Sequence, residues 1–355
     1  MAVYTAVDKS TDFFEPKLFT GNGGTTTVTG LSFEPDMTWL KNRSVAGDQE
    51  IYDKVRGATY RIYPNSTAAQ DSLAEGLKAW TSDGFTVGTN GAINGNGNDI
   101  VSWNWKMNGT GSSNTEGSIN TTKTSANTTS GCAIITYTGT GANATIGHGL
   151  GKVPTMIIFR RYEQAENWDV YHKAIGNAKS VRLNETGAQF DNATALNSTT
   201  PTSSLITLGS SVTTNANGNP MIAWCFTDTK GFSKMSFYEG NGSATDGPFI
   251  FTGFAPAFVM CRKYDGADNW MMFTNKISSS TGTDGGYNIH SRILEANGNG
   301  AEQSVGTGQG IDFLSNGFKI REDNGNLNGS GSAYLFMSFA ENPFVTSTGI
   351  PSTAK

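Results

Sequence analysis

The sequence has few charged residues and no long apolar run, and each shortage excludes a class of protein. Charged side chains make up only 15% of the chain, and the formal net charge is −5. Because binding to a phosphate backbone depends on basic surface, this balance argues against a nucleic-acid partner. Apolar runs such as residues 156–159 are far shorter than the roughly 20 residues of a membrane helix, so we expect no membrane insertion. The N-terminus also lacks the basic and apolar regions of a secretory signal.

Cysteines and histidines are too scarce and too scattered for a metal or catalytic centre. They are Cys132, Cys225 and Cys261, and His148, His172 and His290. We expect the cysteines to be reduced core residues without a disulfide, and the histidines to be ordinary surface residues. The chain contains no nucleophile elbow, phosphate loop or calcium loop. The sequence therefore predicts a protein that is not an enzyme and holds no cofactor or metal.

Glycine, at 44 of 355 residues, and aromatic side chains, at 11%, are abundant. This mixture favours strands joined by tight turns, so the sequence predicts an all-β fold. The length fits two or three domains, each with its own core. One helix is expected over residues 66–80, where Thr67 and Gln70 could form a capping box, although Gly76 interrupts the pattern.

Three segments of the chain repeat the same landmarks. Each opens with an aromatic residue and a Gly-x-Gly turn, at residues 19–23, 137–141 and 238–242. A proline follows after sixteen to eighteen residues (Pro35, Pro154 and Pro256), and an apolar run then ends in a basic residue six positions after the proline. An aromatic residue falls seventeen after each proline, and an Asn/Gly-rich turn precedes a closing apolar strand. Constant spacing indicates a fixed strand geometry, so we predict three tandem, divergent β-sandwich units.

These landmarks set the expected domain limits. An N-terminal arm spans 1–16, the units span 17–107, 132–230 and 231–345, and a C-terminal tail spans 346–355. Residues 108–131 are almost all Gly, Ser, Thr and Asn, so we expect a linker or long surface loop. In the closing strands, alternation places one pair of large apolar residues on the core face of each sandwich layer: Trp103 with Trp105, Trp224 with Phe226, and Met337 with Phe339.

Aromatic and basic residues at repeated positions are candidate contacts for a glycan or a protein partner. Trp168 and Trp270 each follow an asparagine in a polar stretch, as a sugar-binding face would require, although their matching positions favour a structural role in a strand. The basic candidates at strand exits are Lys41, Arg43, Arg160, Arg161, Arg262 and Lys263. They indicate either solvated strand edges or contacts with an anionic glycan or a neighbouring subunit.

Four stretches of the first unit carry a resemblance to a known group of proteins. They are FEPDMTWLKNR at 33–43, IYDKVRGAT at 51–59, SDGFTVG at 82–88 and VSWNWK at 101–106, and the ending FAENPF at 339–344 adds to them. Together they resemble a domain that recurs in virion structural proteins of tailed bacteriophages, especially marine ones. The resemblance is strong over 17–107 and looser in the last unit. It implies lectin-like jelly-roll units without catalytic residues, in a protein that is assembled into the virion in the host cytoplasm.

Three functional hypotheses of different kinds follow. The leading one is a tail fibre, appendage or adhesin that binds other virion proteins or a host cell-surface glycan. A capsid or tail-tube decoration protein is the alternative, because the chain offers only a short arm and no long shaft. A glycan depolymerase would need a pair of carboxylates in a cleft, which the repeats do not provide. We expect a homo-oligomer, with a trimer favoured, because repeated weak sites raise avidity.

Overall fold

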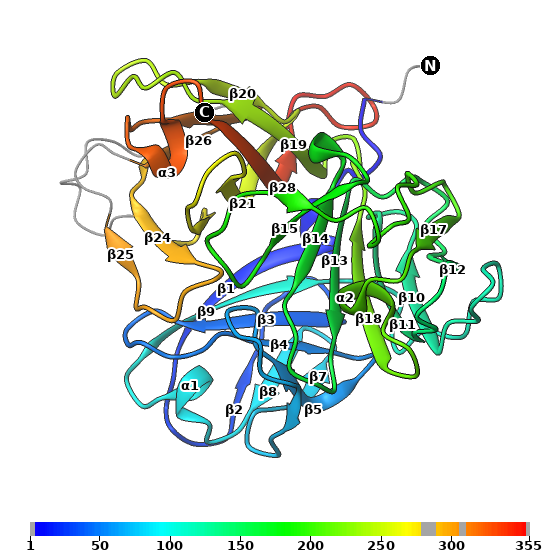
Figure 1. Ribbon diagram of the computed structural model, residues 1–355. Coiled ribbons are helices and arrows are strands. Elements are labelled where there is room, and N and C mark those ends of the chain that lie inside the picture. The colour runs from blue at the N-terminus through cyan, green and yellow to red at the C-terminus, as the bar shows by residue number, and fades with distance from the viewer. Residues whose placement is uncertain (1–3, 278–288, 305–309, 353–355) are drawn as a thin grey trace.

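The computed structural model describes residues 4–277, 289–304 and 310–352, and within these ranges the protein is all-β (Figure 1). Several antiparallel sheets make up the fold, which confirms the predicted all-β class. The helices in these ranges are single turns: α1 (Gly91–Asn94), α2 (Val212–Asn215), α3 (Gly325–Asn328), and the 3-10 turns η1 (Ser10–Asp12) and η2 (Lys173–Ile175). No helix in the described part of the chain is long and apolar enough to cross a membrane.

The first of three large sheets, sheet 1, has the strand order β1-β9-β3-β4-β5-β6. Its strands are β1 (Phe14–Thr20), β9 (Asp99–Trp105), β3 (Met37–Asn42), β4 (Glu50–Asp53), β5 (Gly57–Ile62) and β6 (Asp71–Ser72). A smaller sheet packs against it, in the order β2 (Thr26–Val28), β8 (Gly84–Val87) and β7 (Leu77–Thr81). The apolar cluster between the two sheets includes Leu40, Tyr52 and Phe85, so this part of the fold is sandwich-like.

Sheets 2 and 3 follow the strand order of sheet 1, except that sheet 2 has one additional edge strand, β10. Sheet 2 comprises β10 (Lys123–Asn127), β11 (Cys132–Thr138), β18 (Pro220–Phe226), β13 (Met156–Arg161), β14 (Asp169–His172), β15 (Lys179–Arg182) and β16 (Phe190–Asp191), with β12 (Ala144–Gly147) and β17 (Leu205–Leu208) as its small sheet. Sheet 3 comprises β19 (Ser233–Glu239), β28 (Ala333–Pro343), β21 (Phe254–Lys263), β22 (Trp270–Thr274), β24 (Arg292–Glu295) and β25 (Gln303–Ser304). Its small sheet is β20 (Phe249–Phe251), β27 (Gly317–Ile320), β26 (Ile311–Leu314) and β23 (Ile289–His290).

The repeated spacing in the sequence corresponds to a repeated register in the three large sheets. In each sheet, the residue two after the landmark proline pairs with the second large apolar residue of the closing strand. The pairs are Met37 with Trp105, Met156 with Phe226, and Phe258 with Phe339. The three prolines therefore hold the same place relative to the closing strands β9, β18 and β28.

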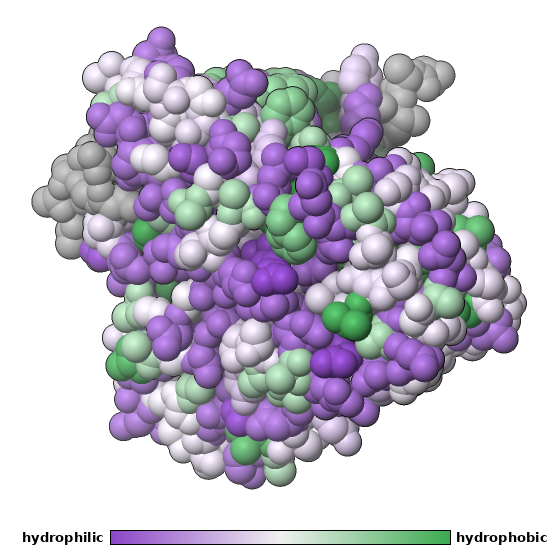
Figure 2. Space-filling view, viewed as in Figure 1, coloured by the Kyte–Doolittle hydropathy of each residue, from purple (hydrophilic) through white to green (hydrophobic). Residues whose placement is uncertain are grey.

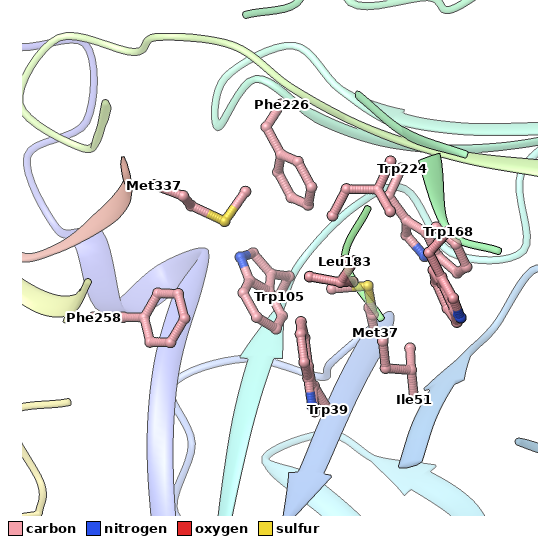
Figure 3. Close-up of a pocket in the computed structure, with 11 residues that line it drawn as sticks. Met37, Trp39, Ile51, Trp105, Trp168, Leu183, Trp224, Phe226, Phe258 and Met337 are labelled. Carbon is pink, nitrogen blue, oxygen red and sulfur yellow. The ribbon is translucent and has the colours of Figure 1, made fainter. Parts of the chain in front are cut away.

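One apolar core, formed by the other faces of the three large sheets, joins them in the middle of the molecule. Trp105, Phe226, Phe258 and Phe339 all belong to it, and the ring centroids of Phe226 and Phe339 lie 5.9 Å apart. Figure 3 shows side chains from all three sheets pointing into this centre, around a void of only about 20 Å³. A void of this size is close to the packing limit of protein interiors, so the three sheets form one block.

The sequence located these core residues but assigned them to the wrong core. Trp103 and Trp105 are buried, as predicted, yet their face packs on the other large sheets and not on the small sheet formed by β2, β8 and β7. The same holds for the corresponding pairs in β18 and β28. The cysteines are buried, as predicted, whereas the prediction of surface histidines is wrong, because all three are buried.

Two segments differ from their expected local structure. The helix expected over 66–80 is absent: the segment contains β6 and most of β7, and the remainder is a loop. The apparent capping pair, Thr67 and Gln70, instead has backbone groups that bond to residues of sheet 2. The stretch 108–131, expected to be a linker or a long loop, contributes β10, which pairs along five residues with β11.

Candidate functional site

The six basic candidates lie at or just after the ends of β3, β13 and β21, where solvated strand edges were expected. The structure places three of the six in the interior. Lys41, Arg160 and Arg262 are each 0% exposed. Each reaches away from its own sheet to a loop of another sheet, and these loops follow β5, β15 and β24. We call these loops the receiving loops, and they comprise residues 63–70, 183–189 and 296–302. The prediction of a solvated edge is therefore wrong for these three cations.

Arg160 connects sheet 2 to sheet 1. One terminal nitrogen, Nη2, donates hydrogen bonds of 2.6 Å to the carbonyl oxygens of Thr67 and Ala68. The guanidinium lies 5.5 Å from the ring centroid of Trp168, whose indole Nε1 donates to the carbonyl oxygen of Ser66 at 3.0 Å. Arg160 and Trp168 thus bind one receiving loop together, through backbone acceptors.

Arg262 and Trp270 make the corresponding connection from sheet 3 to sheet 2. Arg262 donates to the carbonyl oxygens of Glu185, at 2.6 Å, and Gly187. Its guanidinium lies 5.6 Å from the ring centroid of Trp270, whose Nε1 donates to the carbonyl oxygen of Arg182 at 2.9 Å. Trp168 and Trp270 are at most 1% exposed, so neither can stack on a surface glycan.

Sheet 1 binds sheet 3 with different side chains in the same places. Lys41 Nζ donates to the carbonyl oxygen of Asn299 at 3.3 Å. Gln49 stands fourteen after Pro35, where the other repeats have tryptophan, and its Nε2 donates to the carbonyl oxygens of Glu295, Ala296 and Gly298 at 2.6 to 3.1 Å. The sequence analysis missed Gln49, although its spacing from the proline was the available signal.

The three connections close a ring, because sheet 1 binds sheet 3, sheet 3 binds sheet 2, and sheet 2 binds sheet 1. Two backbone hydrogen bonds recur at every junction. The first set is Gly47 N to Asn299 O, Glu166 N to Thr67 O, and Asp268 N to Thr186 O, all within 3.0 Å. The second set is Glu302 N to Arg43 O, Gln70 N to Tyr162 O, and Gln189 N to Tyr264 O, again within 3.0 Å. The three junctions therefore share these backbone bonds, and the junction between sheets 1 and 3 differs from the other two in its side chains.

Burial changes the electrostatics of the junction cations. Loss of solvent lowers the pKa of Arg160 and of Arg262 to about 10, and that of Lys41 to about 8. All three remain charged at neutral pH, because these values lie above 7. Hydrogen bonds to backbone carbonyl groups compensate each cation for its loss of hydration, and a tryptophan ring adds to this for the two arginines.

The other basic candidates lie at the outer ends of the same junctions and are partly exposed. Arg43 forms an ion pair of 2.5 Å with Glu302, across the sheet 1 to sheet 3 junction. Arg161 lies 3.4 Å from Glu166 within sheet 2. Lys263 is partly exposed, and its carbonyl oxygen accepts a hydrogen bond from Arg262 Nε at 3.0 Å. Of these three, Arg43 bonds across a junction, and the three side chains do not converge on one surface site.

A polar cleft of about 300 Å³ lies between sheets 1 and 2. Its lining residues are Val55, Arg56, Tyr60, Gln70, Thr122, Lys123, Thr136, Tyr162 and Glu163. Tyr60 is 41% exposed, and Tyr162 is partly exposed. Arg56 is held by Asp53 at 2.7 Å, and Lys123 donates to the carbonyl oxygen of Val55, so both cations form part of the cleft wall. Two tyrosines beside an amide and a carboxylate suit a sugar, which presents hydroxyl groups and an apolar ring face.

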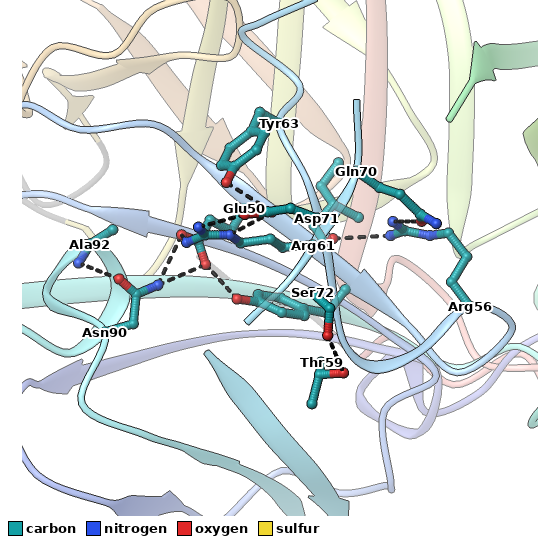
Figure 4. Close-up of polar contacts among 12 residues, drawn as sticks. Glu50, Arg56, Thr59, Arg61, Tyr63, Gln70, Asp71, Ser72, Asn90 and Ala92 are labelled. Atoms are coloured by element: carbon teal, nitrogen blue, oxygen red, sulfur yellow. Dashed lines mark hydrogen bonds and ion pairs between the residues drawn. The ribbon is translucent and has the colours of Figure 1, made fainter. Parts of the chain in front are cut away.

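A cluster of charged and polar residues centres on Glu50, in the interior of sheet 1 (Figure 4). Its carboxylate accepts hydrogen bonds from Tyr52 at 2.5 Å, Arg61 at 2.7 Å and Asn90 at 2.9 Å. Arg61 also binds Asp71 through two nitrogens, at 2.8 and 2.9 Å. Burial raises the pKa of Glu50, and Glu50 is 1% exposed. The groups around the buried Glu50 carboxylate are all hydrogen-bonded to it, so the cluster stabilises the sheet. Glu50 and Asp71 therefore do not form a pair of accessible carboxylates such as a glycan hydrolase needs.

Metal-ligating groups are equally dispersed. Within residues 4–277, 289–304 and 310–352, no group of three or more His, Cys, Asp or Glu side chains converges on one point. Among the described residues, the cleft between sheets 1 and 2 is one open polar feature with room for a ligand, and its chemistry favours binding.

Comparison with known proteins identifies a family and nothing more specific. A family model described as Domain of unknown function (DUF7483) matches residues 9–343, nearly the whole chain. Neither the curated proteins nor the solved structures contain a match to this chain.

Proposed function

The chain belongs to the DUF7483 family, and we propose that it is a non-enzymatic structural protein of a bacteriophage virion, acting as a tail appendage, tail fibre or adhesin. In this proposal it consists of three tandem, lectin-like β-sandwich units. It binds other virion proteins and a host cell-surface glycan, as a homo-oligomer. The phage assignment rests on the sequence stretches at 33–43, 51–59, 82–88 and 101–106.

The observation that carries the proposal is the closed ring of three junctions around one apolar core. Buried Arg160, Arg262 and Lys41 fix each large sheet against a loop of another. A component of a particle has to transmit force and present surfaces without changing shape, and a block joined at every junction suits that task. This supports a passive binding role over a catalytic one that depends on a moving lid.

The cleft between sheets 1 and 2 is the proposed glycan contact. Tyr60 and Tyr162 would stack on sugar rings, while Gln70 and Glu163 would bond to hydroxyl groups. This replaces Trp168 and Trp270, whose burial removes them from any surface contact. Affinity of one cleft would be weak, and repetition on a particle would raise it.

A capsid or tail-tube decoration protein is the second candidate. The observation that favours it is the compact arrangement of all three large sheets around one centre, with no extended shaft in the described part of the chain (Figure 1). The two candidates share the virion location and differ in the surface that is bound.

Immunogold labelling of intact particles tests the virion location. We expect gold on particles, at the tail for an appendage and over the shell for a decoration protein. Labelling confined to infected-cell cytoplasm would contradict the proposal, and so would cleavage of host polysaccharide by the purified chain.

A glycan array tests the cleft. The chain should bind host-surface glycans when clustered on beads, and Tyr60→Ala with Tyr162→Ala should abolish this binding. Tyr4→Ala is the matched control, because Tyr4 is an exposed tyrosine outside the cleft. Equal loss in the control, or none in the double variant, would remove the cleft from the proposal.

A further inference from the structure

One open side of the third sandwich carries an apolar patch at the edges of two strands. Phe237 in β19, and Phe249 and Phe251 in β20, are 52%, 47% and 55% exposed. They line a hollow of about 220 Å³ between the edges of the large and small sheets, together with Lys234. In Figure 2, hydrophobic atoms gather at the top of the molecule, over β20. We call this surface, defined by Phe237, Phe249, Phe251 and Lys234, the β19–β20 edge.

The corresponding side of the second sandwich is covered by the chain itself. There, β10 pairs with β11, and Thr122 N donates to the carbonyl oxygen of Thr136 at 2.7 Å. Just before this, Ile119 N donates to the carbonyl oxygen of Thr145 at 2.9 Å, and Ile119 forms a parallel bridge to Ile146 in β12. A single extended segment, residues 118–127, thus lies along both strand edges.

The two sides correspond residue by residue. Phe237 is the fifth residue of β19, as Thr136 is the fifth residue of β11. In the small sheets, Ile250 of β20 corresponds to Ile146 of β12, and both are buried. The neighbours of Ile250 are Phe249 and Phe251, whereas those of Ile146 are Thr145 and Gly147. Phenylalanine therefore replaces small residues at three positions that the covering segment occupies in the second sandwich.

Among the residues that the structure describes, no comparable segment covers the third sandwich. Residues 106–131 separate β9 from β11, whereas only residues 227–232 separate β18 from β19. This short connection contacts only the start of β19, where Asp228 accepts from Met235 N at 2.8 Å and Thr229 N donates to the carbonyl oxygen of Ser233. Among the described strands, β19 remains an edge of sheet 3, and β20 remains an edge of its small sheet.

We propose that the β19–β20 edge binds an extended peptide segment of a partner protein, which adds to β19 as β10 adds to β11. Main-chain hydrogen bonds to β19 at Phe237 would hold the strand, and its apolar side chains would fill the hollow. Lys234, whose Nζ donates to the carbonyl oxygen of Phe251 at 2.7 Å, places a positive charge at the rim. The partner segment therefore alternates apolar with polar residues and carries an acidic side chain.

This inference does not depend on the virion role proposed above, because it rests on the fold alone. Edge strands of soluble proteins are normally covered or carry charged residues to prevent unwanted pairing. The β19–β20 edge instead carries three exposed phenylalanines and is not covered by any described strand. They mark an interaction surface, since contiguous apolar patches on monomers are rare.

A peptide selection tests the proposal with the full chain as bait and a displayed library of random 12-residue peptides as the probe. We expect enriched peptides with alternating apolar residues and at least one Asp or Glu. A fluorescent copy of the best peptide should bind at least tenfold more weakly to the triple variant Phe237→Thr, Phe249→Thr, Phe251→Thr. The matched control is Val153→Thr with Val212→Thr, two exposed apolar residues elsewhere, which should bind as the wild type does.

Three results would overturn the proposal. The first is no enrichment over empty beads, and the second is equal binding to the triple variant. The third is a wild-type dimer in sedimentation that the triple variant converts to a monomer, because the occupant would then be a second copy of this chain. All substituted side chains are at least 43% exposed, so the variants should fold, and circular dichroism checks this.

Discussion

The guanidinium of Arg160 donates a hydrogen bond of 2.6 Å to the carbonyl oxygen of Thr67, a residue 93 positions earlier in the chain, in the loop that follows β5 of sheet 1. The same group bonds to Ala68 and lies over the ring of Trp168, while its Nε and Nη1 have no hydrogen-bond partner among the described residues. Moving a cation from water into the protein costs free energy, and the hydrogen bonds to the receiving loop offset that cost.

Arg160→Ala should therefore destabilise the protein by about 3 kcal/mol, because it removes the hydrogen bonds to the carbonyl oxygens of Thr67 and Ala68 and leaves a cavity at the junction. Urea unfolding measures this change. The matched control is the neighbouring Arg161→Ala, which removes a partly exposed arginine and should cost less than about 1 kcal/mol. Similar losses in both variants would show that the junction contact contributes little.

Phe258 tests whether the three sheets unfold together. Its ring lies in the shared core, 5.7 Å from Trp103 and 6.0 Å from Phe14. Phe258→Ala should cost about 3 to 5 kcal/mol and should shift one cooperative thermal transition without splitting it. The exposed Val212→Ala is the control and should shift the midpoint little. Separate transitions in calorimetry would mean that each large sheet unfolds independently of the others.

The stability of the protein should depend on pH through Glu322. Burial raises the pKa of this carboxyl to about 7, so the folded protein keeps a proton that the unfolded chain releases near pH 4.5. The stabilisation is present below about pH 4.5 and is lost as the pH rises to about 7, a change on the order of 3 kcal/mol. Glu322→Gln should therefore lose less stability than the wild type between pH 5 and pH 7.5 in urea unfolding.

Other groups also titrate in this range, so the comparison is between variants. Burial lowers the pKa of His172 to about 4, and this residue makes the protein less stable as the pH falls below about 6.5. The exposed Glu239→Gln provides the control and should follow the wild type. A slope for Glu322→Gln equal to that of the wild type would refute the assignment.

Period-two alternation and repeated spacing allowed the closing strands to be predicted from the sequence. Trp103 and Trp105 could be placed on one buried face, because a strand with large apolar residues at alternate positions has to cover them. The partner of that face could not be predicted. A burial pattern is the same whether a small sheet or another large sheet provides the cover, so the shared core was missed.

The junction cations show a second limit of sequence reasoning. A basic residue at the end of an apolar run normally reaches water, and Lys41, Arg160 and Arg262 fit that pattern locally. Their acceptors are backbone carbonyl groups of loops that lie far away in the sequence, and carbonyl groups leave no mark in composition. The recurrence of the cation at one spacing was used to predict the repeat but not a shared contact, and Gln49 at the tryptophan position was not used at all.

Closure of the three junctions also limits how such a chain can evolve. Open arrays of repeats gain or lose copies at their ends, because an end repeat needs only a capping surface. Here every large sheet both donates a cation and offers a receiving loop. In a chain with a fourth copy, no cation and no receiving loop of the ring would be left free to bind it. In a chain with two copies, one cation would have no receiving loop and one receiving loop would have no cation. Duplication therefore cannot lengthen this molecule one step at a time, and change is directed to the outer loops and open edges, where Phe237, Phe249 and Phe251 already differ from the other copies.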